Sequence, residues 1–111
     1  MEGAVTQGDI YWYRFKRPDK RRPVLILTQQ AAILFLTSLT IAPITSTIRK
    51  IPTEVVLTRS DGLFNECAVN LDNIQTVQKA KIEEFIAHLS VQKMSEVAQA
   101  IEFAFDLDEF R

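Results

Sequence analysis

The chain has 111 residues, of which 47% are hydrophobic and 24% are charged, a composition typical of one soluble globular domain over residues 1–111. Its single cysteine, Cys67, excludes an intrachain disulfide framework and favours a reducing, cytoplasmic setting. Its single histidine, His88, excludes a metal centre that needs several histidines from one chain, so the residues predict no metal and no cofactor.

The net charge of −1 hides an asymmetry between the two halves of the chain. Residues 1–60 carry nine Lys and Arg against four Asp and Glu, whereas residues 61–111 carry four against ten. The basic side chains are concentrated between positions 14 and 22, at Arg14, Lys16, Arg17, Lys20, Arg21 and Arg22. Such a cluster can hold phosphate groups, although a solvated loop has the same composition.

An uncharged run over residues 23–48 is long enough to span a bilayer. Its interior contains Thr28, the pair Gln29-Gln30 and Pro43, which are costly in lipid. We therefore expect two strands of a soluble core with a turn between them. Residues 1–8 lack the basic and apolar regions of a signal peptide, so they are not expected to be one, and with the polar interior of the uncharged run no membrane partner is predicted.

The first part of the chain predicts short strands. Turn signals stand at Gly8-Asp9 and Asp61-Gly62. Between and after them, alternation and β-branched residues predict strands at 10–15, 24–28, around Leu39 to Ile44, and at 53–57, 68–71 and 74–77. On the first of these strands the side chain of Trp12 lies on the opposite face from its neighbours, so only one face can reach a ligand and the other belongs to the core.

The hydrophobic period then changes to that of a helix. Ile82, Phe85, Ile86 and Leu89 fall at helical spacing and predict one helix, and residues 94–105 predict a second one capped by Ser90. Strands followed by helices indicate the α+β class, with a small antiparallel barrel or sheet covered on one side. Phe103 and Phe110 do not fit the inward face of the second helix, so they pack on the sheet or contact another chain.

Together these residues resemble the MazF/PemK-type toxins, the endoribonuclease half of bacterial type II toxin–antitoxin pairs. The resemblance covers nearly the whole chain and depends on the order and spacing of several segments. They are Gly8-Asp9-Ile10-Tyr11-Trp12, Arg22-Pro23-Val24-Leu25-Ile26-Leu27, Ala42-Pro43-Ile44-Thr45-Ser46, Pro52-Thr53-Glu54-Val55, Gly62-Leu63, Leu71-Asp72-Asn73-Ile74-Gln75-Thr76-Val77 and the helical Glu96-Val97 and Ala100-Ile101.

The resemblance implies a compact SH3-like antiparallel β-barrel with C-terminal helices, of the MazF/PemK/CcdB type, that forms a homodimer. It also implies cytoplasmic, metal-independent and sequence-specific cleavage of single-stranded mRNA, which arrests translation and growth, and inhibition by a cognate antitoxin protein. The expected products carry a 2′,3′-cyclic phosphate and a 5′-OH. Arg22 and Thr45 match the catalytic positions of the family, and we expect RNA contacts from Lys16, Lys20, Arg21, Asp72, Asn73 and Gln75.

Some positions depart from the family pattern, so the cleaved sequence cannot be carried over. The loop at 16–21 is short and basic, while Asn70 and Gln75 stand where other members carry arginine. For the chemistry, the Arg22 guanidinium suits charge stabilisation and the Thr45 hydroxyl suits hydrogen bonding. The base that takes the 2′-OH proton is left open between Asp72 and the phosphate itself.

Two other functions remain as alternatives. One is a CcdB-like toxin of the same fold that binds gyrase without catalysis, but that activity depends on a C-terminal tryptophan, and the only tryptophan here is Trp12. The other is an RNA- or protein-binding barrel without catalysis. Apart from the resemblance, Arg22 reads as a surface arginine, Thr45 as a strand-end hydroxyl and Asp72-Asn73 as a turn.

Overall fold

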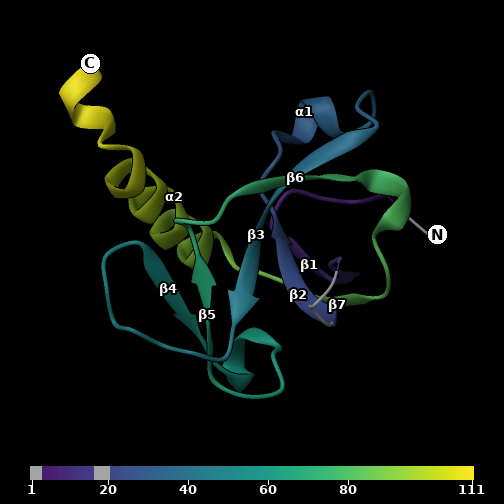
Figure 1. Ribbon diagram of the computed structural model, residues 1–111, viewed down its shortest axis with the longest axis horizontal. Helices are drawn as coiled ribbons and strands as arrows, with labels where there is room; N and C mark the ends of the chain where they lie inside the picture. The colour runs from purple at the N-terminus through teal and green to yellow at the C-terminus, as the bar shows by residue number, and fades with distance from the viewer. Residues whose placement is uncertain (1–3, 17–20) are drawn as a thin grey trace.

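The computed structural model describes residues 4–16 and 21–111, which form one curled antiparallel sheet and a C-terminal helix (Figure 1). The strands are β1 (Asp9–Arg14), β2 (Arg21–Ile26), β3 (Ser38–Thr45), β4 (Glu54–Leu57), β5 (Cys67–Asn70), β6 (Gln75–Gln78) and β7 (Phe85–His88). The helices are α1 (Gln30–Ile33) and α2 (Val91–Phe105), with short 3₁₀ turns at Arg59–Asp61, Lys79–Lys81 and Leu107–Phe110. None of the helices in these residues is long and apolar enough to cross a membrane.

Strand β3 is the centre of the sheet because it pairs with three other strands. The order is β4-β5-β3-β2-β1-β7, and β6 also pairs with β3. On the edge of β3 that does not pair with β2, strand β6 pairs with the first half, from Ser38 to Ile41. Strand β5 pairs with the end of the same edge, at Ile44 and Thr45. The turn between β5 and β6 consequently lies beside the middle of β3.

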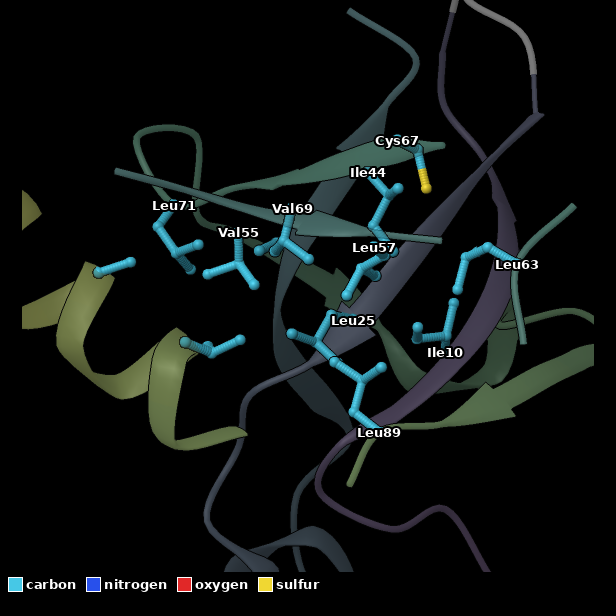
Figure 2. Close-up of a cluster of buried hydrophobic side chains, with 13 residues drawn as sticks. Ile10, Leu25, Ile44, Val55, Leu57, Leu63, Cys67, Val69, Leu71 and Leu89 are labelled. Carbon is cyan, nitrogen blue, oxygen red and sulfur yellow. The ribbon is translucent and has the colours of Figure 1, made fainter. Parts of the chain in front are cut away.

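Both faces of the sheet are buried at β1 and β2, because the sheet curls around two clusters of apolar side chains. Ile10 and Leu25 are cross-strand partners that enter one cluster, which α2 covers (Figure 2). The next pair, Tyr11 and Val24, enters the other cluster together with Leu39. Tyr11 is thus a core residue and Trp12 is only half-buried, as expected, but Ile10, on the same face as Trp12, also belongs to the core.

Helix α2 begins as its sequence predicts. The Ser90 Oγ accepts a hydrogen bond from the Lys93 backbone N–H at 3.1 Å, and Val97 and Ala100 are buried against the core. Phe103 and Phe110 are 61% and 79% exposed, which excludes packing of these rings on the sheet.

The helix expected over 82–89 is wrong, because this segment forms β7 and completes the sheet beside β1. Asp9 pairs with His88 and Ile10 with Ala87, and the Leu89 N–H donates to the Gly8 carbonyl at 3.0 Å. The apolar spacing fits either structure, and these long-range backbone hydrogen bonds decide for the strand. In the uncharged run, both strands are confirmed as β2 and β3, but the connection contains α1 instead of a simple turn.

We expect Gly62→Ala to destabilise the fold by about 2–4 kcal/mol. Gly62 has φ +97°, and a Cβ built there lies 2.8 Å from the Ala87 Cβ on β7. Urea denaturation measures the loss, and Ser60→Ala in the same turn is a control without either constraint. An unchanged midpoint for Gly62→Ala would mean that the turn adapts freely.

Candidate active site

The two side chains that we expect to be catalytic lie side by side, Arg22 near the beginning of β2 and Thr45 at the end of β3. Val24 pairs with Pro43 across these strands. Extending that antiparallel register by two residues places Arg22 opposite Thr45. Both side chains line two adjoining depressions of the surface, so they form the wall that the two depressions share.

The larger of these depressions, the aromatic cleft, has a volume of about 440 Å³. Beyond Arg22 and Thr45 it is lined by Trp12, Arg21, Pro23, Ile44, Ser46, Thr47, Leu63, Phe64, Asn65, Glu66 and Cys67. The rings of Trp12 and Phe64 stack with centroids 5.9 Å apart and planes inclined by 17°. Phe64 is largely exposed, so the cleft offers an aromatic surface on which a nucleobase can stack.

The smaller depression, the amide pocket, has a volume of about 180 Å³. Its other lining residues are Phe15, Pro43, Arg49, Asn70, Asn73 and Gln75. Three of these carry side-chain amides, which both donate and accept hydrogen bonds. Among the described residues no acidic side chain lines it, and the cationic groups that line it are the guanidiniums of Arg22 and Arg49.

Arg21 lines one side of the aromatic cleft, but its charge is already paired with two carboxylates of the protein. Its Nε donates to the Glu83 Oε1 at 2.7 Å, its Nη2 donates to Glu84, and its guanidinium lies 4.8 Å from the centre of the Trp12 ring. The hydrogen bond to Glu83 is the main reason that the pKa of Arg21 is raised. Arg21 therefore holds the Trp12 ring in place, and its expected phosphate contact would have to compete with two carboxylates.

The Thr45 hydroxyl is arranged to donate a hydrogen bond. Its Oγ1 accepts from the Thr47 backbone N–H at 3.1 Å. Because that bond uses an oxygen lone pair, the hydroxyl hydrogen remains available for a ligand.

Cys67 also lines the aromatic cleft, but it is not a nucleophile. Burial, together with the nearby charge of Asp61, raises the pKa of the Cys67 thiol to about 11, so it stays protonated at neutral pH. Its expected role as a small core residue is confirmed by its burial.

The other predicted RNA contacts divide into two groups. Asn73 and Gln75 line the amide pocket. Asp72 and Lys16 line neither depression, and the Asp72 Oδ2 accepts a hydrogen bond from the Thr53 hydroxyl at 2.6 Å. Asp72 thus joins the β5–β6 turn to the loop before β4. Lys20 lies outside the described residues.

Sequence reasoning missed Phe64, Asn65 and Glu66 in the aromatic cleft and Arg49 in the amide pocket. Arg49 carried one signal, as the first charge after the uncharged run. Asn70 was noted only as a departure from the family pattern, and the structure places it in the amide pocket.

No three His, Cys, Asp or Glu side chains within residues 4–16 and 21–111 come together in a way that could hold a metal ion. The Asp9 carboxylate is instead engaged by protein groups, since its Oδ2 accepts from the Tyr11 hydroxyl at 2.9 Å and its Oδ1 lies 2.8 Å from the His88 Nδ1. That network lies at the β1–β7 edge and lines neither depression of the site.

Known proteins with related sequences and folds agree on one family. Endoribonuclease MazF3 of Mycobacterium tuberculosis is 42% identical over 90 residues, which are 81% of this chain and 87% of that protein. The structure of the M. tuberculosis toxin MazF-mt6 matches with a TM-score of 0.81 and 38% identity, covering 88% of this chain and 96% of that one.

A mycobacterial endoribonuclease solved in complex with its cognate antitoxin matches with a TM-score of 0.83 and 27% identity, covering 94% of this chain and 97% of that one. The family model described as "PemK-like, MazF-like toxin of type II toxin-antitoxin system" matches residues 6–105, nearly the whole length. The curled antiparallel sheet with one C-terminal helix is the α+β fold that this resemblance implied. The chain therefore belongs to the PemK-like, MazF-like toxin family of type II toxin–antitoxin systems.

Proposed function

We propose that this protein, a MazF-type endoribonuclease toxin, cleaves single-stranded RNA at the wall formed by Arg22 and Thr45 and uses no metal ion. The observation that carries the proposal is the meeting of these two side chains between an aromatic cleft and an amide-lined pocket. A strand laid across the wall has room for a base on each side, with the scissile phosphate between them.

In the proposed reaction the RNA 2′-oxygen attacks the adjacent phosphorus, the bond from phosphorus to the 5′-oxygen breaks, and a 2′,3′-cyclic phosphate forms. The Arg22 guanidinium pairs with two phosphate oxygens and stabilises the charge that develops there. The Thr45 hydroxyl donates to a phosphate oxygen. Because Asp72 lines neither depression and is engaged by Thr53, a phosphate oxygen is our candidate to carry the 2′-OH proton to the leaving 5′-oxygen.

The same proposal includes a cognate antitoxin and a second copy of the chain as partners, and a cytoplasmic location where mRNA is available. One related structure is an endoribonuclease bound to its cognate antitoxin. The exposed Phe103 and Phe105 at the end of α2, and Phe110 in the 3₁₀ turn after it, support contact with another chain, because rings this exposed gain from burial in an interface.

Cleavage of a mixed single-stranded RNA pool by the purified protein is expected to continue in EDTA. The mechanism above takes its charge stabilisation from Arg22, so chelation of divalent ions removes nothing that it needs. Mapping the ends is expected to show one preferred short sequence, with 5′-OH products.

A strict Mg²⁺ requirement, or products with a 5′-phosphate, would contradict this chemistry. Intact RNA together with inhibited gyrase would instead favour the CcdB-like alternative. RNA that is bound but never cut would favour a binding barrel without catalysis.

A further inference from the structure

A buried carboxylate, that of Glu54, pairs with Arg49, which lines the amide pocket. The Glu54 side chain, at the start of β4, is only 1% exposed. Its Oε1 accepts a hydrogen bond from the Arg49 backbone N–H at 2.9 Å, whereas its buried Oε2 has no hydrogen-bond partner within the described chain. A buried carboxylate oxygen without a donor opposes folding, so its presence calls for a reason other than stability.

The nearest cation to that oxygen is the side chain of the same arginine. The Arg49 Nη1 lies 3.6 Å from the Glu54 Oε2. One carboxylate therefore holds Arg49 at two points, through its backbone and through its guanidinium. The Glu54 carboxylate of this ion pair is buried, whereas the Arg49 guanidinium is 55% exposed. The guanidinium can therefore bind a ligand while the carboxylate holds it in position.

The backbone next to Arg49 is held in an unfavourable conformation. Lys50 has φ +57°, in the left-handed region that residues with a side chain rarely occupy. The Glu54 N–H donates to the Ile51 carbonyl at 3.0 Å, which closes this turn onto β4. Strain of this kind is kept where a local geometry has to be enforced, and here it lies directly after Arg49 in the loop that leads to Glu54.

The position of Arg49 in the amide pocket indicates what the Glu54–Arg49 ion pair does. Arg49 lines the amide pocket, which shares Arg22 and Thr45 with the aromatic cleft. The described part of the chain contributes no acidic side chain to the lining of this pocket, and Glu54 is buried outside that lining, so these residues present cationic and amide groups to a ligand. An anion entering it meets Arg22 at the shared wall and Arg49 beyond.

We propose that Arg49 is a second phosphate-binding residue, which holds the RNA phosphate next to the scissile one, and that Glu54 is a positioning residue that orients it. The inference rests on the proposed function, since Arg22 and Thr45 take the scissile phosphate there. A strand that continues from the shared wall into the amide pocket brings its next phosphate to Arg49. The fork of the guanidinium suits two oxygens of that phosphate.

The test measures binding of a short fluorescent RNA of random sequence, 2′-O-methylated throughout so that it cannot be cut, over a range of KCl concentrations. Arg49→Ala is expected to weaken binding about tenfold or more, since it removes charge-assisted hydrogen bonds. It is also expected to reduce the salt slope by about 0.7, the contribution of one phosphate on a single strand. Arg49→Lys should keep the slope and lose affinity, because lysine keeps the charge without the fork. Arg111→Ala, beyond the 3₁₀ turn that follows α2, is the control and should match the wild type.

Glu54→Gln separates positioning from simple support of the fold. It removes a buried charge with an unsatisfied oxygen, so the Tm is expected to stay level or rise while RNA binding weakens several-fold. A supporting role alone would lower the Tm and leave the affinity unchanged. The double variant Arg49→Ala/Glu54→Gln avoids leaving Glu54 without its cation, and it is expected to bind RNA as weakly as Arg49→Ala.

The outcomes distinguish this inference from the proposed function. If the wild type cuts unmodified RNA but the double variant binds the methylated RNA with wild-type affinity and slope, the assignment of Arg49 is wrong and the proposed function stands. If the wild type neither binds nor cuts RNA, the proposed function is wrong and the assignment of Arg49 fails with it.

Discussion

Arg22→Ala is expected to lower kcat for RNA cleavage by about 10²–10³-fold, the usual effect of removing one preorganised group that stabilises transition-state charge. Arg22 makes no side-chain hydrogen bond or ion pair with the described residues, and it is half-exposed. Its loss is therefore expected to change the free energy of unfolding by no more than about 0.5 kcal/mol. Single-turnover cleavage of an RNA with a mapped cut site measures the effect on the chemical step.

Arg22→Lys is the informative companion to that variant. Lysine keeps a positive charge but cannot pair with two phosphate oxygens at once, so an activity between those of alanine and arginine is expected. Arg111→Ala controls for the loss of one exposed cation elsewhere, because the Arg111 Nη2 donates to Glu102 and the residue lines neither depression. Equal rates for Arg22→Ala and the wild type would remove Arg22 from the site.

Thr45→Val is expected to lower kcat by about tenfold to a hundredfold, since it deletes one hydrogen bond to a charged phosphate while keeping the shape of the side chain. Binding of the uncleavable RNA is expected to change less, because Arg22 and the stacking surface remain. The comparison of kcat with KM in steady-state assays makes the distinction. Ser46→Ala, the next residue of the same cleft, is the matched control.

A fall in affinity with unchanged kcat would reassign Thr45 to substrate binding. In that case the hydroxyl would hold the RNA equally in its ground and transition states. Wild-type kinetics for Thr45→Val would exclude any role for its hydroxyl.

Much of the sheet could be predicted from the sequence because alternation along a strand is a local signal. The strands around Tyr11, Val24 and Ile41 show this alternation. Ser90 marks the start of α2 by another local signal, because it is a favourable N-cap residue. The segment at 82–89 shows that a local signal can predict the wrong structure. Its spacing suits a helix, yet its backbone hydrogen bonds go to β1, more than seventy residues away along the chain.

The candidate site could be predicted only in part. Arg22 and Thr45 could be named from family resemblance, but that they lie side by side follows from the pairing of β2 with β3. The Glu54–Arg49 pair could not be foreseen. Glu54 precedes the buried Val55, so alternation places it facing solvent, yet its side chain is buried and its Oε1 accepts from the Arg49 backbone N–H in the loop before β4.

Basic composition was a weaker guide than geometry. Of the cations between positions 14 and 22, Arg22 lines both depressions, whereas Arg21 is held by Glu83 and Glu84. These carboxylates come from the acidic second half of the chain, so the charge asymmetry of the sequence is partly neutralised between the start of β2 and the segment before β7. A count of charges along the chain does not show this, because the partners are about sixty residues apart.

The central claim is that the RNA 2′-OH attacks its own phosphate at the wall formed by Arg22 and Thr45. The most direct measurement uses an RNA with a mapped cut site, in which one 2′-deoxy sugar replaces the ribose on the 5′ side of the cleaved bond. Our account predicts that the wild-type protein binds this RNA with nearly unchanged affinity and does not cut it at that bond, with or without EDTA. Cleavage of the deoxy-substituted bond at the normal rate would contradict the account, because the attacking oxygen would then have to come from elsewhere.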